Sequence, residues 1–249
     1  MFPGKVGRSK TMNLLLVNDY AELSHTAAEM IAAAVATKPT AALVLATGDT
    51  PMGAYAELAR MKDTGAFDPA QLRAFQLDAY LGVALDDPRS LYGWLKRAFI
   101  DPLHISSKHV VTLPDDTSDP EAACMAYDAA VAAAGGFDVS VLGLGPNGHL
   151  GFNEPPSPAD APTRRVKLTE ASLISNARYW GGRDVPHEAI TCGMQQLLAT
   201  KQTILVVSGA RKRSILKQTL EGPITPDVPS SLLRLTQNVT VIADRDAAG

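Results

Sequence analysis

Short apolar runs alternate with longer segments of helical periodicity along almost the whole chain. The apolar runs predict strands at residues 14–17, 41–46, 74–77, 139–144, 203–207 and 239–243. The periodic segments predict helices at residues 20–36, 51–62, 91–100, 120–134, 187–199 and 210–220. Continuous hydrophobicity at 41–46 and 139–144 is typical of parallel strands that are covered on both faces. The alternation therefore predicts an α/β fold: a single domain with a doubly wound (Rossmann-like), mostly parallel sheet and helices on both faces.

Two proline-rich stretches interrupt this alternation. Residues 154–163 contain four prolines and open a region without strong periodicity. Because loops of this length in compact domains are usually active-site lids or disordered, we expect a lid at about 155–184. The second stretch, 222–229, is predicted to be a surface connection. Residues 1–11 are polar and basic, and we expect a disordered N-terminal extension there, followed by one domain over 12–249.

Charge and cysteine content restrict the class of protein. Lys and Arg number 23 against 26 Asp and Glu, a net charge of −3, which lacks the basic footprint of a nucleic-acid binder. No apolar stretch of about 18 residues predicts a membrane span, and the run at 14–17 is too short for a signal peptide. The two cysteines, Cys124 and Cys192, are too few for a disulfide framework. We therefore expect a cytoplasmic protein with no nucleic-acid or membrane partner.

The turn after the second predicted strand has the composition of an anion site. Ligands of open α/β sheets bind beyond the carboxyl ends of the strands, and the residues there are Thr47, Gly48, Asp49 and Thr50. Glycine lets the backbone approach a ligand closely, and the free N–H groups at a helix start bind phosphate. Thr50 is expected to cap the following helix. The alternative is a well-formed strand–turn–helix junction without a ligand.

A single carboxylate, Asp78, follows the third predicted strand. A carboxylate partly removed from water has its pKa raised toward the range that suits a general base. The alternative is that Asp78 is only a cap or a turn former.

The densest group of polar side chains follows the strand at 139–144. Asn147, His149, Asn153 and Glu154 lie within eight positions, among glycines whose ordering costs entropy. Core packing does not explain why the chain would bear that entropic cost, so we expect these side chains to take part in catalysis or binding. The alternative is a hydrogen-bonded structural loop. No metal site is expected, because no second histidine lies near His149 and no His-Glu-x-x-His motif occurs.

Two cations are candidates to meet a bound phosphate, Arg178 and Lys212. Lys212, with its neighbours Arg211 and Arg213, follows a predicted strand and opens a helix. Basic residues at a helix start oppose the helix dipole, so an anionic partner would be favourable there. For Arg211 and Arg213 the alternative is a solvated surface patch.

Together these motifs resemble the glucosamine-6-phosphate deaminase (isomerase) family and its galactosamine-6-phosphate relatives. The resemblance covers residues 12–246 and depends most on the block Leu-Gly-Leu-Gly-Pro-Asn-Gly-His-Leu-Gly-Phe-Asn-Glu-Pro at 142–155. The shorter motifs are Thr-Gly-Asp-Thr-Pro (47–51), Leu-Asp-Ala-Tyr (77–80), Ser-Asn-Ala-Arg (175–178), Gly-Ala-Arg-Lys (209–212) and Asn-Val-Thr-Val-Ile (238–242).

The resemblance implies an enzyme without metal or organic cofactor. It would be an isomerase and also a hydrolase, converting glucosamine 6-phosphate or galactosamine 6-phosphate, and water, into a ketohexose 6-phosphate and ammonia. The resemblance assigns Asp78 the transfer of the C2 proton to C1 and His149 the opening of the sugar ring. Asn147 and Glu154 would hold the tautomer and charge of His149.

The same resemblance implies that the turn at 47–50, with Arg178 and Lys212, grips the phosphate. The lid would exclude water during enolisation. A homo-oligomer is compatible with the family.

Three departures from the family pattern make the substrate less determined than the reaction class. Ala79 stands where an acidic residue usually follows the base, so help from a second carboxylate is expected to be absent. Asp49 stands where a small neutral residue is usual, and its charge is expected to point away. Pro162 stands before Thr163 and Arg164, where an arginine is common. Control by N-acetylglucosamine 6-phosphate, which the resemblance associates with longer members of the family, is not expected.

Two other functions stay open at this point. A 6-phosphogluconolactonase has a similar glycine loop but does not usually continue into Phe-Asn-Glu-Pro, as residues 152–155 do. A non-catalytic sugar-phosphate sensor would keep the cations and lose Asp78 and His149.

Overall fold

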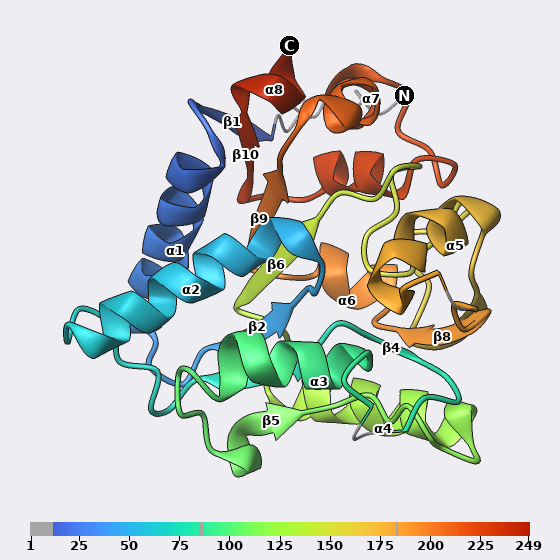
Figure 1. The fold of residues 1–249 in the computed structure, drawn as a ribbon, viewed down its shortest axis with the longest axis horizontal. Coiled ribbons are helices and arrows are strands. Elements are labelled where there is room, and N and C mark those ends of the chain that lie inside the picture. Colours follow the sequence, from blue (N-terminus) through green and yellow to red (C-terminus); the bar gives the residue numbers. More distant parts are fainter. Residues whose placement is uncertain (1–11, 85–86, 183) are drawn as a thin grey trace, which may run out of the picture.

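The computed structural model describes residues 12–84, 87–182 and 184–249, so the predicted extension at 1–11 lies outside the described residues. A sheet of seven strands forms the centre of the molecule (Figure 1), and every neighbouring pair in it is parallel. The predicted α/β class with a mostly parallel sheet is confirmed. From edge to edge the strands are β1 (Asn13–Val17), β10 (Val239–Asp244), β9 (Gln202–Val207), β6 (Val139–Gly143), β2 (Ala42–Leu45), β3 (Arg73–Gln76) and β5 (Val110–Val111).

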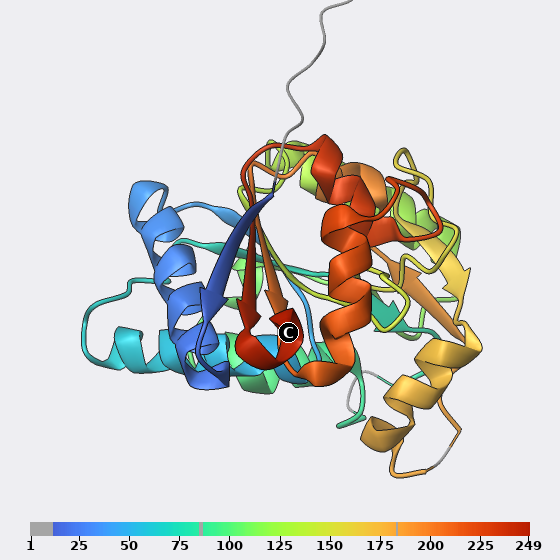
Figure 2. The same cartoon turned by 90° about the horizontal axis from the view of Figure 1, so that it is seen from above.

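Helices cover both faces of this sheet, as Figure 2 shows for the blue α1 and the orange-red α7. Leu43 and Leu45 of β2 point into one buried cluster, and Ala42 and Val44 point into the other, because successive side chains of a strand face opposite ways. The helices of the first cluster are α1 (Tyr20–Thr37), α2 (Asp49–Asp63) and α3 (Leu91–Leu95), which continues as a π-helix over Lys96–Ile100. Those of the second are α4 (Pro120–Ala133), α6 (Met194–Leu198), α7 (Arg213–Glu221) and α8 (Arg245–Ala248).

Aspartate side chains fix the starts of the longest helix on each face. Asp19 accepts a hydrogen bond of 2.9 Å from the backbone N–H of Glu22 at α1. Asp119 accepts one of 2.9 Å from the backbone N–H of Ala122 at α4. These N–H groups have no partner within the helix, so the caps determine where each helix begins. No helix among the described residues is long and apolar enough to cross a bilayer.

A second sheet, of three antiparallel strands, was not predicted from the sequence. Its order is β4 (Asp78–Tyr80), β8 (Glu188–Thr191) and β7 (Arg164–Lys167). The helix predicted at 187–199 is wrong in its first half, which is β8, and only α6 is helical. Ile190 and Thr191 are β-branched and favour a strand, and they pair with β4.

The segment at about 155–184, predicted to be a lid, carries regular structure over its described residues. It contains β7, α5 (Glu170–Asn176) and a 3₁₀ turn over Ala177–Trp180. Further 3₁₀ turns lie at Ser107–His109, Ala210–Lys212 and Pro229–Leu235. The Trp180 ring meets Tyr80 of β4 edge-on at 5.5 Å between centroids. The segment therefore packs on the small sheet, and its movement as a lid stays a prediction.

Leu45→Ala tests the burial of the central strand. Leu45 is fully buried, so its truncation is expected to lower the free energy of unfolding by about 2–5 kcal/mol. Leu16→Ala in the edge strand β1 is the matched control, because Leu16 is 61% exposed and the loss there should be below about 0.5 kcal/mol. Urea unfolding measures both, and equal losses would contradict the assignment of β2 to the core.

Candidate active site

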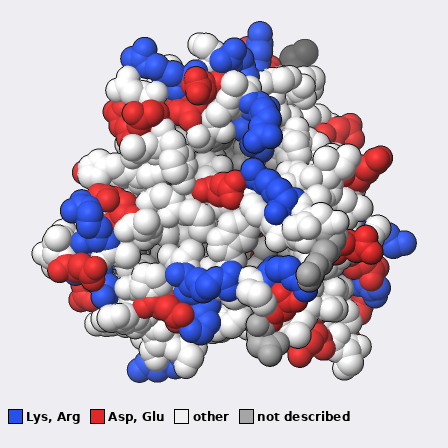
Figure 3. All heavy atoms as spheres, in the orientation of Figure 1, with Lys and Arg blue, Asp and Glu red and all other residues white. Residues whose placement is uncertain are grey.

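The carboxyl ends of several strands open into one crevice. Ligand sites of α/β sheets form at such strand ends. Basic and acidic side chains are interspersed over the face in Figure 3, so any cation that serves the crevice acts locally. Asn147 and Glu154 lie behind His149 rather than on the wall. Asn153 is buried off the wall, where its side chain donates to the backbone carbonyls of Leu150 and Cys192. The other eight residues predicted from the sequence all line the crevice: Thr47, Gly48, Asp49, Thr50, Asp78, His149, Arg178 and Lys212.

The turn between β2 and α2 leaves backbone N–H groups facing outward. Gly48 has φ 105°, a conformation that side chains other than glycine rarely adopt. It occupies the cap position of α2, and no side chain caps this helix. The prediction that Thr50 is the cap is therefore wrong, because the helix already begins at Asp49. An uncapped start leaves the first N–H groups available to an anion.

Asp49 and Arg178 form an ion pair at the mouth of the crevice. Oδ2 of Asp49 lies 2.8 Å from Nη2 of Arg178, so the expectation that the Asp49 charge points away is wrong. The guanidinium of Arg178 also lies over the ring of Tyr179, 4.5 Å from its centroid. Both partners of the pair are about half exposed, at 51% and 59%. Exposed pairs of this kind contribute at most about 1 kcal/mol, so a bound anion can take over Arg178.

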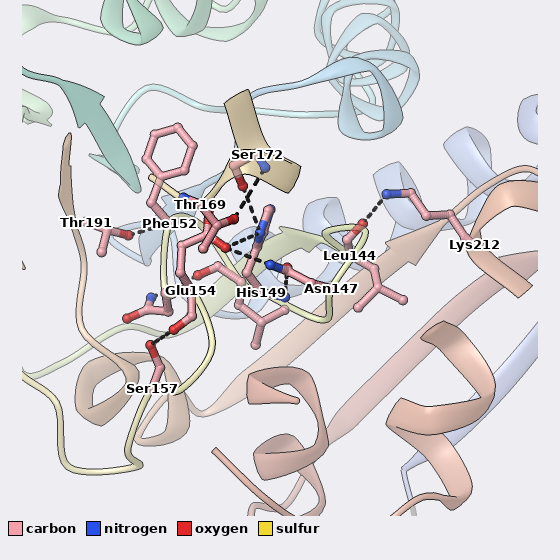
Figure 4. A network of polar contacts seen from close by, with 12 residues as sticks. Leu144, Asn147, His149, Phe152, Glu154, Ser157, Thr169, Ser172, Thr191 and Lys212 are labelled. Atoms are coloured by element: carbon pink, nitrogen blue, oxygen red, sulfur yellow. Dashed lines mark hydrogen bonds and ion pairs between the residues drawn. The ribbon is translucent and has the colours of Figure 1, made fainter. Parts of the chain in front are cut away.

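Lys212 points from the end of the β9–α7 connection, directly before α7, toward the same strand ends. Its Nζ donates a hydrogen bond of 2.5 Å to the carbonyl of Leu144, at the end of β6 (Figure 4). Burial, followed by the charges of Arg178 and Arg211, lowers the pKa of Lys212 to about 8. The ammonium is thus charged at neutral pH and incompletely balanced, and an anion in the crevice would stabilise it.

His149, Asn147 and Glu154 form one hydrogen-bonded group (Figure 4). Oε2 of Glu154 accepts from Nδ2 of Asn147 at 2.8 Å and lies 3.2 Å from Nδ1 of His149. The backbone N–H of His149 donates to Oδ1 of Asn147 at 3.3 Å. Two residues of the 155–184 segment join them: the Thr169 N–H donates to Oε1 of Glu154 at 3.4 Å, and Ser172 Oγ lies 3.3 Å from His149 Nδ1.

The environment of Glu154 determines which nitrogen of His149 carries hydrogen. Burial alone would raise the pKa of Glu154, but the hydrogen bond and charge of His149, with hydrogen bonds from Ser172 and Asn147, lower it to about 2. An ionised carboxylate only accepts, so Nδ1 of His149 carries a hydrogen and Nε2 is left for chemistry. Gly145 makes room for this ring, because an added Cβ would lie 2.0 Å from it.

Asp78 lies on another wall of the crevice, where the chain passes from β3 to β4. Its backbone carbonyl accepts a hydrogen bond of 2.7 Å from the side chain of Gln76. Burial, followed by the charge of Asp115, raises the pKa of Asp78 to about 7. A carboxylate with this pKa can accept a proton near neutral pH, as the sequence position suggested.

Sequence reasoning missed an aromatic wall and two polar groups. Tyr80, Trp94 and Tyr179 line the crevice, and the rings of Trp94 and Tyr179 meet at 4.8 Å between centroids. Their positions in the sequence carry no periodic signal that links them. Thr169 before an acidic residue does predict a helix start, but nothing in the pattern predicts that this helix faces His149 through Ser172. The described residues contain no group of three or more His, Cys, Asp or Glu placed to hold a metal ion.

Fold and site together define an α/β protein with a phosphate-type anion site beside acid–base groups. The chain belongs to the family described as glucosamine-6-phosphate isomerases/6-phosphogluconolactonase, whose model matches residues 18–242. A glucosamine-6-phosphate deaminase of Clostridium acetobutylicum is 37% identical over 95% of this chain and 99% of its own. The deaminase of Halothermothrix orenii is 38% identical over the same shares.

Solved structures place the fold in the same family. A structure of a monomeric glucosamine-6-phosphate deaminase superposes with a TM-score of 0.92 at 36% identity, covering 95% of this chain and 99% of that one. The 6-phosphogluconolactonase of Thermotoga maritima superposes with a TM-score of 0.75 at 20% identity, over 94% and 99%. At that identity the likeness to the lactonase shows the fold alone.

The expectation of a hydrolase is wrong. The relatives that are 37% and 38% identical are named deaminases, whereas the similar hydrolase, a lactonase, shares only the fold. The relatives support an isomerase and deaminase instead, a class whose central step is a proton transfer.

Asp49→Asn tests the ion pair at the mouth. The exchange removes a negative charge beside the turn at 48–50 and frees Arg178, so inorganic phosphate is expected to bind about 3- to 10-fold more tightly, a gain of up to about 1.4 kcal/mol. Calorimetric titration at low salt measures the affinity. Asp63→Asn at the far end of α2 is the control and should change nothing. Weaker binding in Asp49→Asn would mean that Asp49 supports the anion site.

Proposed function

We propose that this chain is an aminosugar-phosphate deaminase/isomerase. It converts glucosamine 6-phosphate, or galactosamine 6-phosphate, into a ketohexose 6-phosphate and ammonia. The observation that carries the proposal is that one crevice joins a buried carboxylate, Asp78, to a carboxylate-held histidine, His149, beside an uncapped helix start and Lys212. The relatives named above support the same reaction.

The phosphate is bound first in this scheme. The N–H groups of Gly48, Asp49 and Thr50 face a dianion at the start of α2, where the helix dipole favours negative charge. Lys212 meets it from the other side, and Arg178 turns from Asp49 to the phosphate. Binding energy from the phosphate then holds C1 and C2 of the sugar between the two catalytic walls.

Ring opening falls to His149. Nε2 takes the proton of the C1 hydroxyl and gives a proton to the ring oxygen as the C1–O5 bond breaks, which leaves an aldehyde. The charge of Glu154 stabilises the protonated imidazole, and Asn147 holds that carboxylate in place. Because Nδ1 is already engaged by Glu154, the transferred proton belongs to Nε2.

Isomerisation falls to Asp78. It removes the proton from C2 as a proton from water adds to the C1 oxygen, which gives an enediol-type intermediate. It then returns the proton to C1 as the nitrogen on C2 gives a proton back to water, which leaves an imine at C2. Ammonia leaves from C2, and water supplies the oxygen of the ketone. A base with a pKa of about 7 combines ionisation at neutral pH with the strength to take a carbon-bound proton. No step needs a metal or an organic cofactor.

The segment at 155–184 is proposed to close over the bound sugar. The contacts that support this are those of Thr169 and Ser172 with Glu154 and His149. A closed segment excludes water while the enediol exists. We also propose a cytoplasmic location, which the two free and buried cysteines support. A homo-oligomer stays a prediction, and the similar solved deaminase is monomeric.

Substrate assays test the function directly. The protein is expected to release ammonia and form ketose phosphate from glucosamine 6-phosphate or galactosamine 6-phosphate, each supplied separately. It is expected to leave 6-phosphogluconolactone unchanged. Ammonia and ketose phosphate are measured together, and lactone opening is followed in parallel. Lactone opening without ammonia release from either amino sugar would overturn the proposal.

Asp78→Asn tests the base. An amide of nearly the same size cannot accept the C2 proton, so exchange of C2 hydrogen with solvent deuterium is expected to fall by about 10²–10⁴-fold. Binding of the sugar phosphate should stay within about 3-fold, because the phosphate contacts are untouched. Asp63→Asn again serves as the exposed control. Persistent exchange in Asp78→Asn would remove Asp78 from the role of base.

A further inference from the structure

The described residues include a second buried carboxylate that the scheme above does not use. The side chain of Asp115 has no exposed surface, and neither of its oxygens has a hydrogen-bond partner among the described residues. Burial of an unpaired carboxylate is costly, and folded proteins rarely retain one without a reason. Capping and turn formation do not provide that reason here, since no backbone N–H is bonded to either oxygen.

The chain holds Asp115 against the segment that carries Asp78. The side-chain amide of Gln76 donates to the carbonyl of Asp78 at 2.7 Å and accepts from the N–H of Leu113 at 3.1 Å. Four residues after Asp78, the N–H of Gly82 donates to the carbonyl of Asp115 at 2.8 Å. Two fixed links thus join segment 113–115 to segment 78–82, one at each end.

In this fold, a side chain at position 79 could not bring a second carboxylate to the side of β4 that bears Asp78. Asp78 and Tyr80 line the crevice, whereas Ala79 belongs to the buried cluster on the other side of β4. Because side chains alternate along a strand, a carboxylate at 79 would face away from the crevice wall that bears Asp78. A second carboxylate near Asp78 must therefore come from another element, and the loop after β5 supplies Asp115.

We propose that Asp115 is a positioning residue of this site, the second carboxylate, whose charge keeps Asp78 a strong base. The expectation of no second carboxylate beside the base is thereby replaced. Asp115 is buried away from the crevice and acts on substrate only through Asp78. The catalytic part of this inference rests on the proposed function, but the effect on the Asp78 carboxyl does not.

The tyrosine and cysteine side chains that interact with Asp78 cannot supply the negative charge assigned to Asp115. Tyr55 on α2, Tyr127 on α4 and Cys192 after β8 interact with Asp78, and burial raises the pKa of each, so all three are neutral at neutral pH. Tyr80 beside it is also held neutral, with its pKa raised by burial.

The charged groups of the same crevice act in the opposite sense. The cations Lys212 and Arg178 line it, and positive charge there lowers the pKa of a carboxyl. The carboxylate of Asp49 also lines the crevice, and it is paired with Arg178. Asp115 itself is faced by Asp116; burial, followed by the charge of Asp116, raises the pKa of Asp115 to about 7.

Asp115→Asn, compared with Asp116→Asn, tests the proposal. Loss of the buried negative charge should lower the pKa of Asp78 by about half a unit or more. The acidic limb of kcat/KM then moves to lower pH by the same amount. The plateau rate is expected to fall by up to about 3-fold for each half unit, because a weaker base takes the C2 proton more slowly. Asp116 is exposed, so Asp116→Asn removes the same charge nearby and should leave limb and plateau nearly in place.

Thermal unfolding against pH separates this role from a structural one. A carboxyl whose folded-state pKa is raised above its unfolded value costs stability at higher pH, progressively from about pH 4 to pH 7 and fully above that. Asp115→Asn should therefore raise the melting temperature at pH 8 and change it little at pH 4. A melting temperature that falls at pH 8 would mean that Asp115 stabilises the fold, and the proposal would be overturned.

A direct titration keeps the test independent of activity. With ¹³C-labelled aspartate, the carboxyl resonance of Asp78 is identified by its loss in Asp78→Asn and followed from pH 4 to pH 9. Its midpoint should be lower in Asp115→Asn than in the unmodified chain. An unchanged midpoint overturns the role of Asp115 whatever the substrate. Absence of ammonia release with a shifted midpoint would instead contradict the proposed function alone.

Discussion

The contact between Glu154 and His149 is the interaction on which most of the site depends. Glu154 is buried, and a buried carboxylate is stable only when donors surround it. His149, Asn147 and the Thr169 N–H supply them. These donors come from the loop after β6 and from the 155–184 segment, so one carboxylate joins the two parts. The glycine at Gly145 follows from the same contact, because the imidazole ring occupies the space a side chain would need.

Asp78 and Glu154 show how different surroundings within one site give two carboxylates opposite properties. Both are buried, and burial raises the pKa of each. At Glu154 the hydrogen bonds and the charge of His149 exceed the effect of burial, and the group stays ionised. At Asp78 the neighbouring charge is another carboxylate, so burial and repulsion add. Pairs of titratable groups whose pKa values are pushed apart are typical of acid–base catalysis. The raised pKa of Asp78 lowers the stability of the folded protein. This cost explains why the segment that carries Asp78 is held by hydrogen bonds as specific as those of the Gln76 side chain.

The sequence predicted the parallel sheet and the residues at its strand ends for physical reasons. Strands such as β2 are apolar throughout because they are covered on both faces, and parallel strands bring their carboxyl ends to one edge. The small sheet could not be predicted, since β4 and β8 are short and their pairing joins residues 78–80 to residues 189–191. Asp115 was not predicted as a site residue, because the sequence around it is typical of a turn. Only the fold reveals that its carboxylate is buried rather than solvated, on a segment hydrogen-bonded to the one that carries Asp78.

The ion pair of Asp49 and Arg178 shows how a protein with a small negative net charge can contain an anion site. A crevice with two unbalanced cations and an uncapped helix start would attract any anion present. Asp49 balances the charge of Arg178. A bound dianion can exceed the energy of this ion pair, but a weakly bound monoanion cannot easily match it. The pair therefore favours ligands that bring two negative charges and further contacts with Lys212. Under the proposed function, this competition would favour a sugar phosphate over simple anions, in a protein whose overall charge is −3.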